Sequence, residues 1–279
     1  MTVKDLQGCV VFLDSGAGGL PYLNAYNTLN PDRMVLYIAD KKNFPYGEKT
    51  KNELVTILIR LTERIQKFFS PALIVLACNT ASVSALSELR QRFPATDFVG
   101  TVPAVKPALI YSVKKNIAVI GTERTLADDY ITRIAEEAAG GGAITRIAAG
   151  ELVDFVEYRL EYSGKAERIT LVKKYTDEAR KRGADALALG CTHFLFLLDE
   201  FREAAEPYIR VFDSINGVCG RIESVLSKKK PPSPITRRAG QPNPLLVTGG
   251  KALDAAEQWD LRAERFNLES FKPDGWDDR

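Results

Sequence analysis

Short apolar runs alternate along the chain with longer amphipathic stretches, and this alternation restricts the fold class more than any other feature. Helical spacing is clearest in Asn52–Phe69, and Thr80–Phe93 and Lys165–Arg182 also have it. Nine apolar runs are predicted as strands buried on both faces: Val10–Leu13, Met34–Ala39, Ala72–Ala77, Phe98–Val102, Ile117–Ile120, Ile144–Ala148, Ala186–Leu189, Ile209–Phe212 and Leu245–Val247. The pattern predicts an α/β fold with mostly parallel sheets, whose sites form at the carboxyl ends of strands.

Composition excludes several classes of function. The 279 residues suffice for one large domain or two smaller ones, and the net charge of +2 gives no reason to expect nucleic acid or an anionic membrane as a partner. The apolar run Cys9–Leu13 ends at Asp14, which is too soon for a signal peptide or a membrane span, so we expect a cytoplasmic protein. The Pro-rich segment 227–244 is predicted to be an exposed linker or long loop, with Lys228-Lys229-Lys230 as a solvated run.

Four cysteines, at positions 9, 78, 191 and 219, form no CxxC pair. Cys9 and Cys219 are predicted to be small buried residues, because their neighbours suggest nothing else. Cys78 and Cys191 each follow a predicted strand and begin a helix, where backbone N–H groups favour the thiolate and lower its pKa from about 8.5. We therefore expect two reactive thiols, on opposite walls of one cleft if two related α/β halves face each other.

Other candidate residues lie near these strand ends. The glycine-rich turn that begins with Asp14 and Ser15 lacks the GxGxxG spacing, but its free N–H groups suit a carboxylate. His193, the single histidine, stands two residues after Cys191. Cys78, Cys191 and His193 match a catalytic zinc site in number, although no HExxH or CxxC motif supports zinc. A Cys–His hydrolase is the other alternative, and it would leave the second cysteine without a role.

Several blocks of sequence resemble the glutamate racemase family, within the aspartate/glutamate racemase superfamily. They are VVFLDSGAGGL at 10–20, YIADKKNFPYGEKT at 37–50, LIVLACNTASVSAL at 73–86, IAVIGTERT at 117–125, LVDFVE at 152–157, ALGCTHFLFL at 188–197, VFDS at 211–214 and LLVTGG at 245–250. The blocks run in the family's order over nearly the whole chain. The resemblance implies exchange of L- and D-glutamate without pyridoxal phosphate, another cofactor or a metal, supplying D-glutamate for peptidoglycan biosynthesis.

The resemblance also implies an organisation and a set of site residues. It predicts an N-terminal domain at 1–98 completed by 212–279, and a second domain at 99–211, the two being pseudo-twofold related across a central cleft. The predicted catalytic residues are Cys78 and Cys191, with Asp14 supporting the first and His193 and Glu157 the second. The predicted substrate-binding residues are Asp14, Ser15, Tyr46, Gly47, Asn79, Thr80, Thr122, Thr192 and His193.

Racemisation explains why there are two cysteines. The proton leaves one face of the α-carbon and returns to the other, and two bases fixed on opposite faces avoid moving one base across the carbanion. Expected partners are glutamate as the small-molecule substrate and a second copy of the chain in a candidate homodimer, with no nucleic acid and no membrane. The alternatives that the residues leave open are a related racemase acting on aspartate and a non-catalytic protein that binds acidic ligands.

Overall fold

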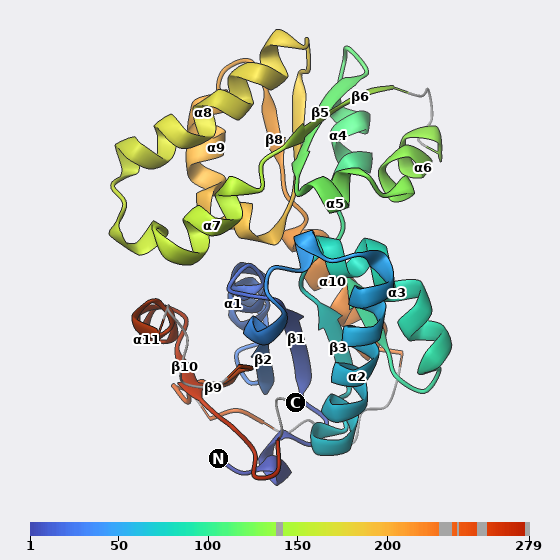
Figure 1. Ribbon diagram of the computed structural model, residues 1–279, viewed down its shortest axis with the longest axis vertical. Helices are drawn as coiled ribbons and strands as arrows, with labels where there is room; N and C mark the ends of the chain where they lie inside the picture. The colour runs from blue at the N-terminus through green and yellow to red at the C-terminus, as the bar shows by residue number, and fades with distance from the viewer. Residues whose placement is uncertain (138–141, 229–235, 239, 250–255, 277–279) are drawn as a thin grey trace. The chain divides into compact units, whose positions relative to one another are not determined.

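The computed structural model describes residues 1–137, 142–228, 236–238, 240–249 and 256–276 (Figure 1). The chain divides into two compact units. The first unit comprises Met1–Thr101 and Ile215–Arg279, and the second comprises Val102–Ser214. Each has its own sheet, so each is described by itself. No helix among the described residues is long and apolar enough to span a membrane.

The first unit contains a six-stranded sheet in which all paired strands are parallel. The strand order is β10-β9-β2-β1-β3-β4. The strands are β1 (Val10–Asp14), β2 (Val35–Ala39), β3 (Leu73–Leu76), β4 (Phe98–Gly100), β9 (Asn243–Val247) and β10 (Leu268–Ser270). Registers Asp14↔Ala39 and Leu13↔Leu76 bring the carboxyl ends of β1, β2 and β3 level at one edge of the sheet.

Helices cover both faces of this sheet (Figure 1). They are α1 (Leu20–Leu29), α2 (Lys51–Phe69), α3 (Asn79–Arg92), α10 (Ile215–Leu226) and α11 (Ala256–Arg265), with short 3-10 helices η1 (Val3–Leu6), η2 (Lys41–Asn43) and η3 (Tyr46–Glu48). The α2 helix begins at a capping box between Thr50 and Glu53 and buries Leu54, Leu58 and Ile65 from one stripe. This stripe and α3 pack on the inner residues of β1, β2 and β3.

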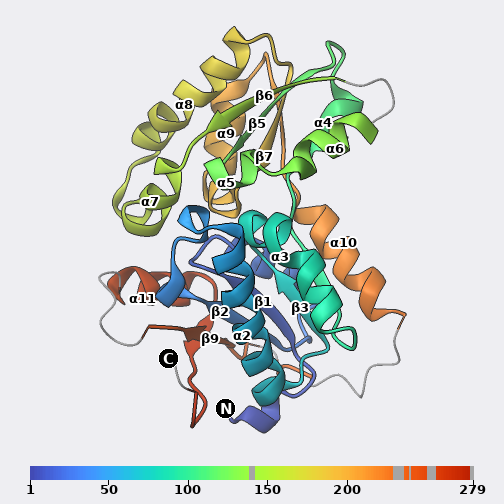
Figure 2. The ribbon, with the colours of Figure 1, turned by 45° about the vertical axis from the view of Figure 1, so that its right-hand side comes forward.

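The second unit contains a four-stranded parallel sheet, in the order β6-β5-β7-β8 (β8 is labelled in Figure 1, and β5, β6 and β7 in Figure 2). Its strands are β5 (Asn116–Gly121), β6 (Ala143–Ala148), β7 (Ala186–Gly190) and β8 (Arg210–Phe212). Its helices are α4 (Val105–Tyr111), α5 (Glu123–Leu126), α6 (Asp129–Glu137), α7 (Glu151–Tyr158), α8 (Lys165–Lys181) and α9 (Leu198–Ala205), with 3-10 helices η4 (Leu160–Tyr162) and η5 (Thr192–Leu197). Residues of α4, α5 and α6 form a hydrophobic core with β5 and β7.

The two sheets repeat one local topology. In each, the first strand pairs with the second on one side and with the third on the other, and the fourth strand follows the third. Cys78 follows the third strand of its sheet and Cys191 the third strand of its own. The two cysteines, which the sequence analysis placed alike after a strand and before a helix, therefore also occupy equivalent positions in the two sheets.

The predicted fold class is confirmed in its main terms: both sheets are parallel, and strands and helices alternate. All nine predicted strands and all three predicted helices are present, with ends shifted by one or two residues. Two expectations were wrong in part. Strand β6 is largely exposed, because it is an edge strand and carries Thr145 and Arg146. The Pro-rich segment ends earlier than predicted, since Asn243 and Pro244 are buried in β9; its residues 229–235 and 239 lie outside the described part.

Candidate active site

Cys78 lies at the carboxyl edge of the first sheet and is the residue directly before the first turn of α3. Its backbone is extended, with φ −143° and ψ 122°, and its carbonyl accepts the Ser82 N–H at 2.9 Å. The side chain is buried but retains 7% exposure. The 14-residue helix α3 therefore directs the positive end of its dipole toward this thiol.

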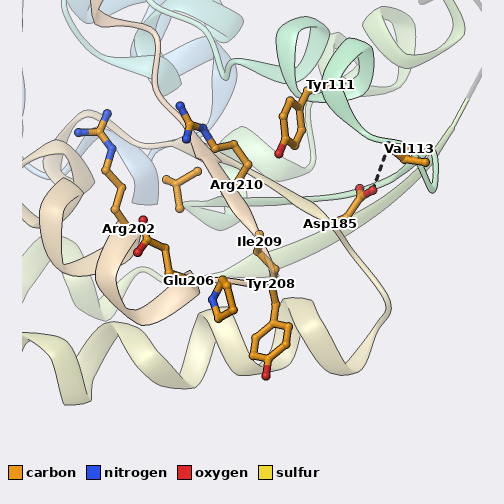
Figure 3. Close-up of a pocket in the computed structure, with 10 residues that line it drawn as sticks. Tyr111, Val113, Asp185, Arg202, Glu206, Tyr208, Ile209 and Arg210 are labelled. Carbon is orange, nitrogen blue, oxygen red and sulfur yellow. Dashed lines mark hydrogen bonds between the residues drawn. The ribbon is translucent and has the colours of Figure 1, made fainter.

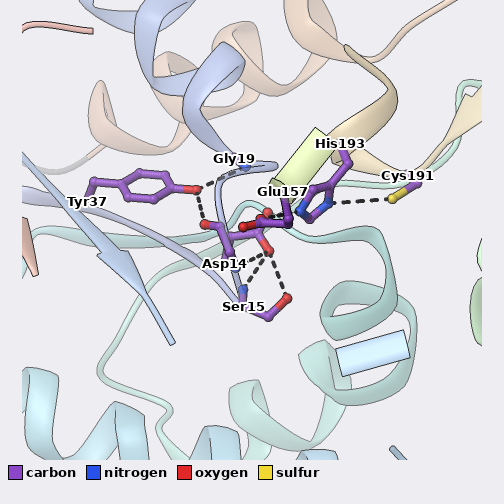
Figure 4. A network of polar contacts seen from close by, with 8 residues as sticks. Asp14, Ser15, Gly19, Tyr37, Glu157, Cys191 and His193 are labelled. Atoms are coloured by element: carbon purple, nitrogen blue, oxygen red, sulfur yellow. Dashed lines mark hydrogen bonds and ion pairs between the residues drawn. The ribbon is translucent and has the colours of Figure 1, made fainter. Parts of the chain in front are cut away.

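The turn after β1 holds a buried carboxylate at the same edge. Asp14 is fully buried, and its Oδ1 accepts hydrogen bonds from the Ser15 N–H at 2.5 Å and from the Gly16 N–H at 3.3 Å (Figure 4). The Ser15 hydroxyl lies 3.3 Å from the same oxygen. These bonds fix the carboxylate at the sheet edge where Cys78 also lies, and the support of Cys78 by Asp14 stays a prediction.

Tyr37 braces this turn from β2. Its hydroxyl donates to the Gly16 carbonyl at 2.9 Å and accepts the Gly19 N–H at 3.0 Å (Figure 4). Gly19 has no room for a side chain, because a Cβ there would lie 2.7 Å from the Cβ of Ala77. The turn is thus pressed against the residue that precedes Cys78. Nothing in the sequence marked Tyr37 as part of this region.

Tyr46 lies in η3 and is buried in the hydrophobic cluster that also contains Cys78. Its hydroxyl donates to Asp40 Oδ2 at 2.8 Å. Burial is the main reason that the pKa of Tyr46 is raised well above its ordinary value, and the negative charges of Asp40, Cys78 and Asp14 raise it further. The phenol therefore stays protonated. The resemblance predicted Tyr46 as a substrate-binding residue and gave no sign of its bond to Asp40.

The first turn of α3 supplies polar groups beside Cys78. Asn79 is 2% exposed, and within the described residues neither its Nδ2 nor its Oδ1 has a hydrogen-bond partner. An unpartnered buried amide is costly, so this side chain is suited to a bound polar ligand. Thr80 is buried next to it, and Gly47 lies half-buried in η3.

Cys191 occupies the corresponding place at the carboxyl edge of the second sheet, before η5. Its Sγ lies 3.8 Å from Nδ1 of His193, and Nε2 of that ring lies 2.8 Å from Glu157 Oε1 (Figure 4). His193 is 3% exposed and Glu157 is fully buried. The second unit thus brings together three residues that the sequence analysis had placed in one group.

The ionisation of His193 follows from its two partners. Burial by itself lowers the pKa of the imidazole, but the hydrogen bonds and charges of Cys191 and Glu157 outweigh burial and raise the pKa to about 10. The ring is therefore a cation at neutral pH, and it offers a positive charge to the sulfur of Cys191.

Two predicted binding residues are near Cys191. Thr192 is 1% exposed in η5. Thr122 follows β5 as Cys191 follows β7, and register Gly121↔Gly190 makes the two strands end level with each other. The Thr122 hydroxyl accepts the Thr125 N–H at 3.3 Å and caps α5, which is a structural task that the sequence did not predict.

The other two cysteines are also buried, but Cys9 precedes β1, at the opposite end of that strand from Asp14, and Cys219 lies in α10. Burial raises the pKa of Cys9 to about 12 and that of Cys219 to about 11. Both therefore remain thiols at neutral pH, in line with the prediction that they are small core residues. Among the described residues, no three His, Cys, Asp or Glu side chains are grouped to hold a metal ion.

The second unit also has a surface pocket of about 680 Å³ (Figure 3). It lies at the amino-terminal ends of the strands, since Arg210 begins β8 and Asp185 immediately precedes β7. None of the predicted site residues lines it. The lining residues are Tyr111, Val113, Asp185, Arg202, Glu206, Pro207, Tyr208, Ile209, Arg210 and Val211.

Comparisons with known proteins find matches that cover most of the chain. The family model described as Asp/Glu/Hydantoin racemase matches residues 24–217. The glutamate racemase of Treponema pallidum is 32% identical over 257 residues, covering 92% of this chain and 93% of the relative. The crystal structure of Escherichia coli glutamate racemase, in complex with L-glutamate and the activator UDP-MurNAc-ala, has a TM-score of 0.81 at 27% identity and covers 95% of this chain and 97% of that one.

A third match is the glutamate racemase of Thermus thermophilus, in complex with beta-chloro-D-alanine. Its TM-score is 0.76 at 26% identity, and the match covers 99% of this chain and 100% of that one. The family model spans more than half of the chain, and the matched relatives are covered almost end to end. The chain belongs to the Asp/Glu/hydantoin racemase family, whose members include amino-acid racemases.

Proposed function

We propose that this chain interconverts L-glutamate and D-glutamate by transferring the α-proton between two cysteines, Cys78 and Cys191. The observation that carries the proposal is their equivalence. Each thiol follows the third strand of a parallel sheet and precedes a helix, beside buried polar groups. The glutamate racemases among the relatives support glutamate as the substrate.

In the proposed reaction, one cysteine enters as a thiolate and the other as a thiol. The thiolate sulfur takes the α-proton, and the electron pair of the C–H bond passes into an enediolate-like carboxylate. The second thiol then delivers its proton to the opposite face of the α-carbon and becomes the thiolate. The roles reverse for the other enantiomer, so that one site serves both directions. No cofactor or metal takes part in this scheme.

The developing charge on the carboxylate needs donors that are already in place. A well-positioned donor contributes about 3–4 kcal/mol in comparable oxyanion sites. We assign this binding to groups at the two strand edges: Ser15, Tyr46, Gly47, Asn79, Thr80, Thr122, Thr192 and His193. Asn79 is the strongest of these assignments, because its buried amide has no partner among the described residues.

The thiols have different supports in this proposal. Asp14 acts beside Cys78, and the imidazolium of His193, held by Glu157, acts on Cys191. We further propose that the product D-glutamate enters peptidoglycan biosynthesis in the cytoplasm. The support for this role is the similarity to glutamate racemases, among them the E. coli relative that was solved with its activator UDP-MurNAc-ala.

The test is a chiral assay of the purified protein with L-glutamate and with L-aspartate, without added cofactor and in the presence of a chelator. We expect racemisation of glutamate. Cys78→Ala and Cys191→Ala should each abolish it in both directions while calorimetry still detects glutamate binding. Turnover by either variant at the wild-type rate contradicts the two-base scheme.

Two matched controls come from the same chain. Cys9→Ala and Cys219→Ala also remove one buried thiol each, but neither thiol lies in the polar groups described above. Both variants should retain activity. Loss of activity in these controls as well would show that removal of any buried sulfur disables the protein, and the assignment of the two bases would then fail.

A further inference from the structure

A buried carboxylate at the end of β2 is held by three neighbouring side chains. Asp40 is 2% exposed. Its Oδ2 accepts the Tyr46 hydroxyl at 2.8 Å, and Asn43 Nδ2 donates to both carboxylate oxygens, at 3.1 and 2.9 Å. Its Oδ1 also accepts the hydroxyl of Thr248, at 2.7 Å. Thr248 lies 208 positions away in the sequence.

The hydroxyl of Thr248 has only one arrangement of hydrogen bonds. Its oxygen accepts the Lys42 N–H at 3.1 Å, and a backbone N–H can only donate. The hydroxyl proton therefore goes to Asp40. The Thr248 N–H donates to the Ala39 carbonyl at 2.9 Å, which continues the pairing of β9 with β2. Thr248 is thus fixed on both sides and 2% exposed.

This arrangement reaches the Cys78 half of the site through Tyr46. The single proton of the Tyr46 hydroxyl is committed to Asp40, so the position of Asp40 sets the orientation of the phenol. Tyr46 and Cys78 lie in one hydrophobic cluster, and η3, which contains Tyr46, packs against α3, which begins directly after Cys78. A displacement of Asp40 is therefore passed through Tyr46 to the start of α3, where Cys78 lies.

We infer that Thr248 is a positioning residue for Cys78, acting through Asp40 and Tyr46. The inference rests on the proposed function and extends it to the residue that follows β9, which lies outside the residues 24–217 matched by the family model. Thr248 does not touch Cys78 in this scheme. It fixes the carboxylate of Asp40, which in turn fixes the hydroxyl of Tyr46.

The first experiment compares Thr248→Val with Thr248→Ser. Valine keeps the shape and the backbone pairing but removes the hydroxyl, whereas serine keeps the hydroxyl. We expect Thr248→Val to lower kcat for glutamate about ten-fold, because a lost hydrogen bond to a charged group and a small misplacement each reach that size. Thr248→Ser should retain most of the activity. Equal losses in the two variants would overturn the inference.

A matched control separates this effect from a general loss of stability. Thr62 is fully buried in α2 of the same unit, and its hydroxyl has no hydrogen-bond partner among the described residues. Thr62→Val removes a buried hydroxyl without breaking such a bond, so it should leave kcat at the wild-type value. A fall like that of Thr248→Val would indicate a structural effect only.

A double-mutant cycle tests the route through Tyr46. If Thr248 acts through the phenol, then Thr248→Val combined with Tyr46→Phe should be no slower than Tyr46→Phe alone. Multiplicative losses would mean that Thr248 acts by another route. The α-deuterium isotope effect shows which cysteine is affected. It should rise in Thr248→Val only for the enantiomer whose proton Cys78 removes.

A readout that needs no turnover separates this inference from the proposed function. In a Cys191→Ala background, iodoacetamide labels Cys78, and peptide mass spectrometry follows the rate. Thr248→Val and Tyr46→Phe should change that rate several-fold and in the same direction, and Thr248→Ser should not. An unchanged rate in Thr248→Val refutes the inference even if the chain racemises glutamate. A changed rate without racemisation would refute only the proposed function.

Discussion

Cys78 and Cys191 occupy the same topological position in their sheets, but the charges around them differ. Cys191 faces the imidazolium of His193, which Glu157 holds from behind. The charges described in the region of Cys78 include the carboxylates of Asp14 and Asp40, which both raise the pKa of Tyr46 in the same hydrophobic cluster. The helix that follows also differs, because α3 has 14 residues whereas η5 is a six-residue 3-10 helix.

This difference shows that the backbone position alone does not determine the chemistry of a thiol. In the proposed mechanism, the dipole of the long helix α3 supports Cys78. Cys191 precedes only a short 3-10 helix, and the proposal assigns its support to the buried pair of His193 and Glu157. We therefore expect the two sides to respond differently when their supports are removed.

The largest effect is expected from His193→Asn. Loss of the imidazolium should slow turnover about 10²–10⁴-fold, the range of a positioned acid or base. The two enantiomers are equally stable, so kcat/KM must fall equally in both directions. The asymmetry will appear in the α-deuterium isotope effect, which should rise for the enantiomer deprotonated by Cys191 and fall for the other.

The isotope effects of this variant also test the comparison itself. Thr248→Val should show the opposite asymmetry, because its effect enters on the Cys78 side. If both variants change the isotope effect for the same enantiomer, the two supports do not belong to different cysteines. Circular dichroism melting of each variant controls for the fraction of folded protein.

A smaller effect is expected from Gly19→Ala, which disturbs only the Cys78 side. A Cβ at this position would meet the Ala77 Cβ at 2.7 Å and the Tyr37 hydroxyl at 2.9 Å, so the turn must move. Overpacking of this kind costs about 1–3 kcal/mol of folding stability. We expect a roughly ten-fold fall in kcat from misplaced groups beside Cys78, measured with the melting temperature.

Gly150 is a suitable control for this substitution. It lies in the second unit, and a Cβ there would meet nothing within 4 Å. Gly150→Ala should keep both kcat and the melting temperature near those of the wild type. If Gly19→Ala behaves like this control, the turn does not help to place Cys78.

Much of the fold was predictable because buried parallel strands leave a simple trace in the sequence. A strand covered on both faces must be continuously apolar, and all nine such runs are strands. The strand β10 (Leu268–Ser270) was missed because only its first residue is apolar and buried. Edge strands have one neighbour and less burial, so their sequences are less constrained.

The two cysteines could be singled out from sequence because strand, cysteine and polar residue follow one another directly. The groups that hold their neighbours could not. Asp40 and Thr248 are 208 positions apart, and their bond depends on the register of β2 with β9. Tyr37 is one of five consecutive buried residues in β2, and only its hydroxyl distinguishes it from a core aromatic residue. Such contacts exist only once the sheet is assembled.

The smallest expected effect concerns folding stability at alkaline pH. It arises on the Cys191 side, because it depends on the raised pKa of His193. The pKa of His193 is raised from 6.5 to about 10 in the folded protein. A raised pKa contributes stability that is fully present below pH 6.5 and is lost as the pH rises through about 10. The wild type should therefore lose more of its melting temperature than His193→Asn over this window, by a few degrees.

The remaining buried cysteines do not obscure this comparison. The pKa values of Cys9 and Cys219 are also raised by burial, to about 12 and about 11, and they too lower stability as the unfolded thiols ionise at high pH. Both are present in the wild type and in the variant, so their contribution cancels in the difference. Equal pH slopes for the two proteins would mean that His193 is not a cation in the folded state, and Cys191 would then have no positive partner in that ring.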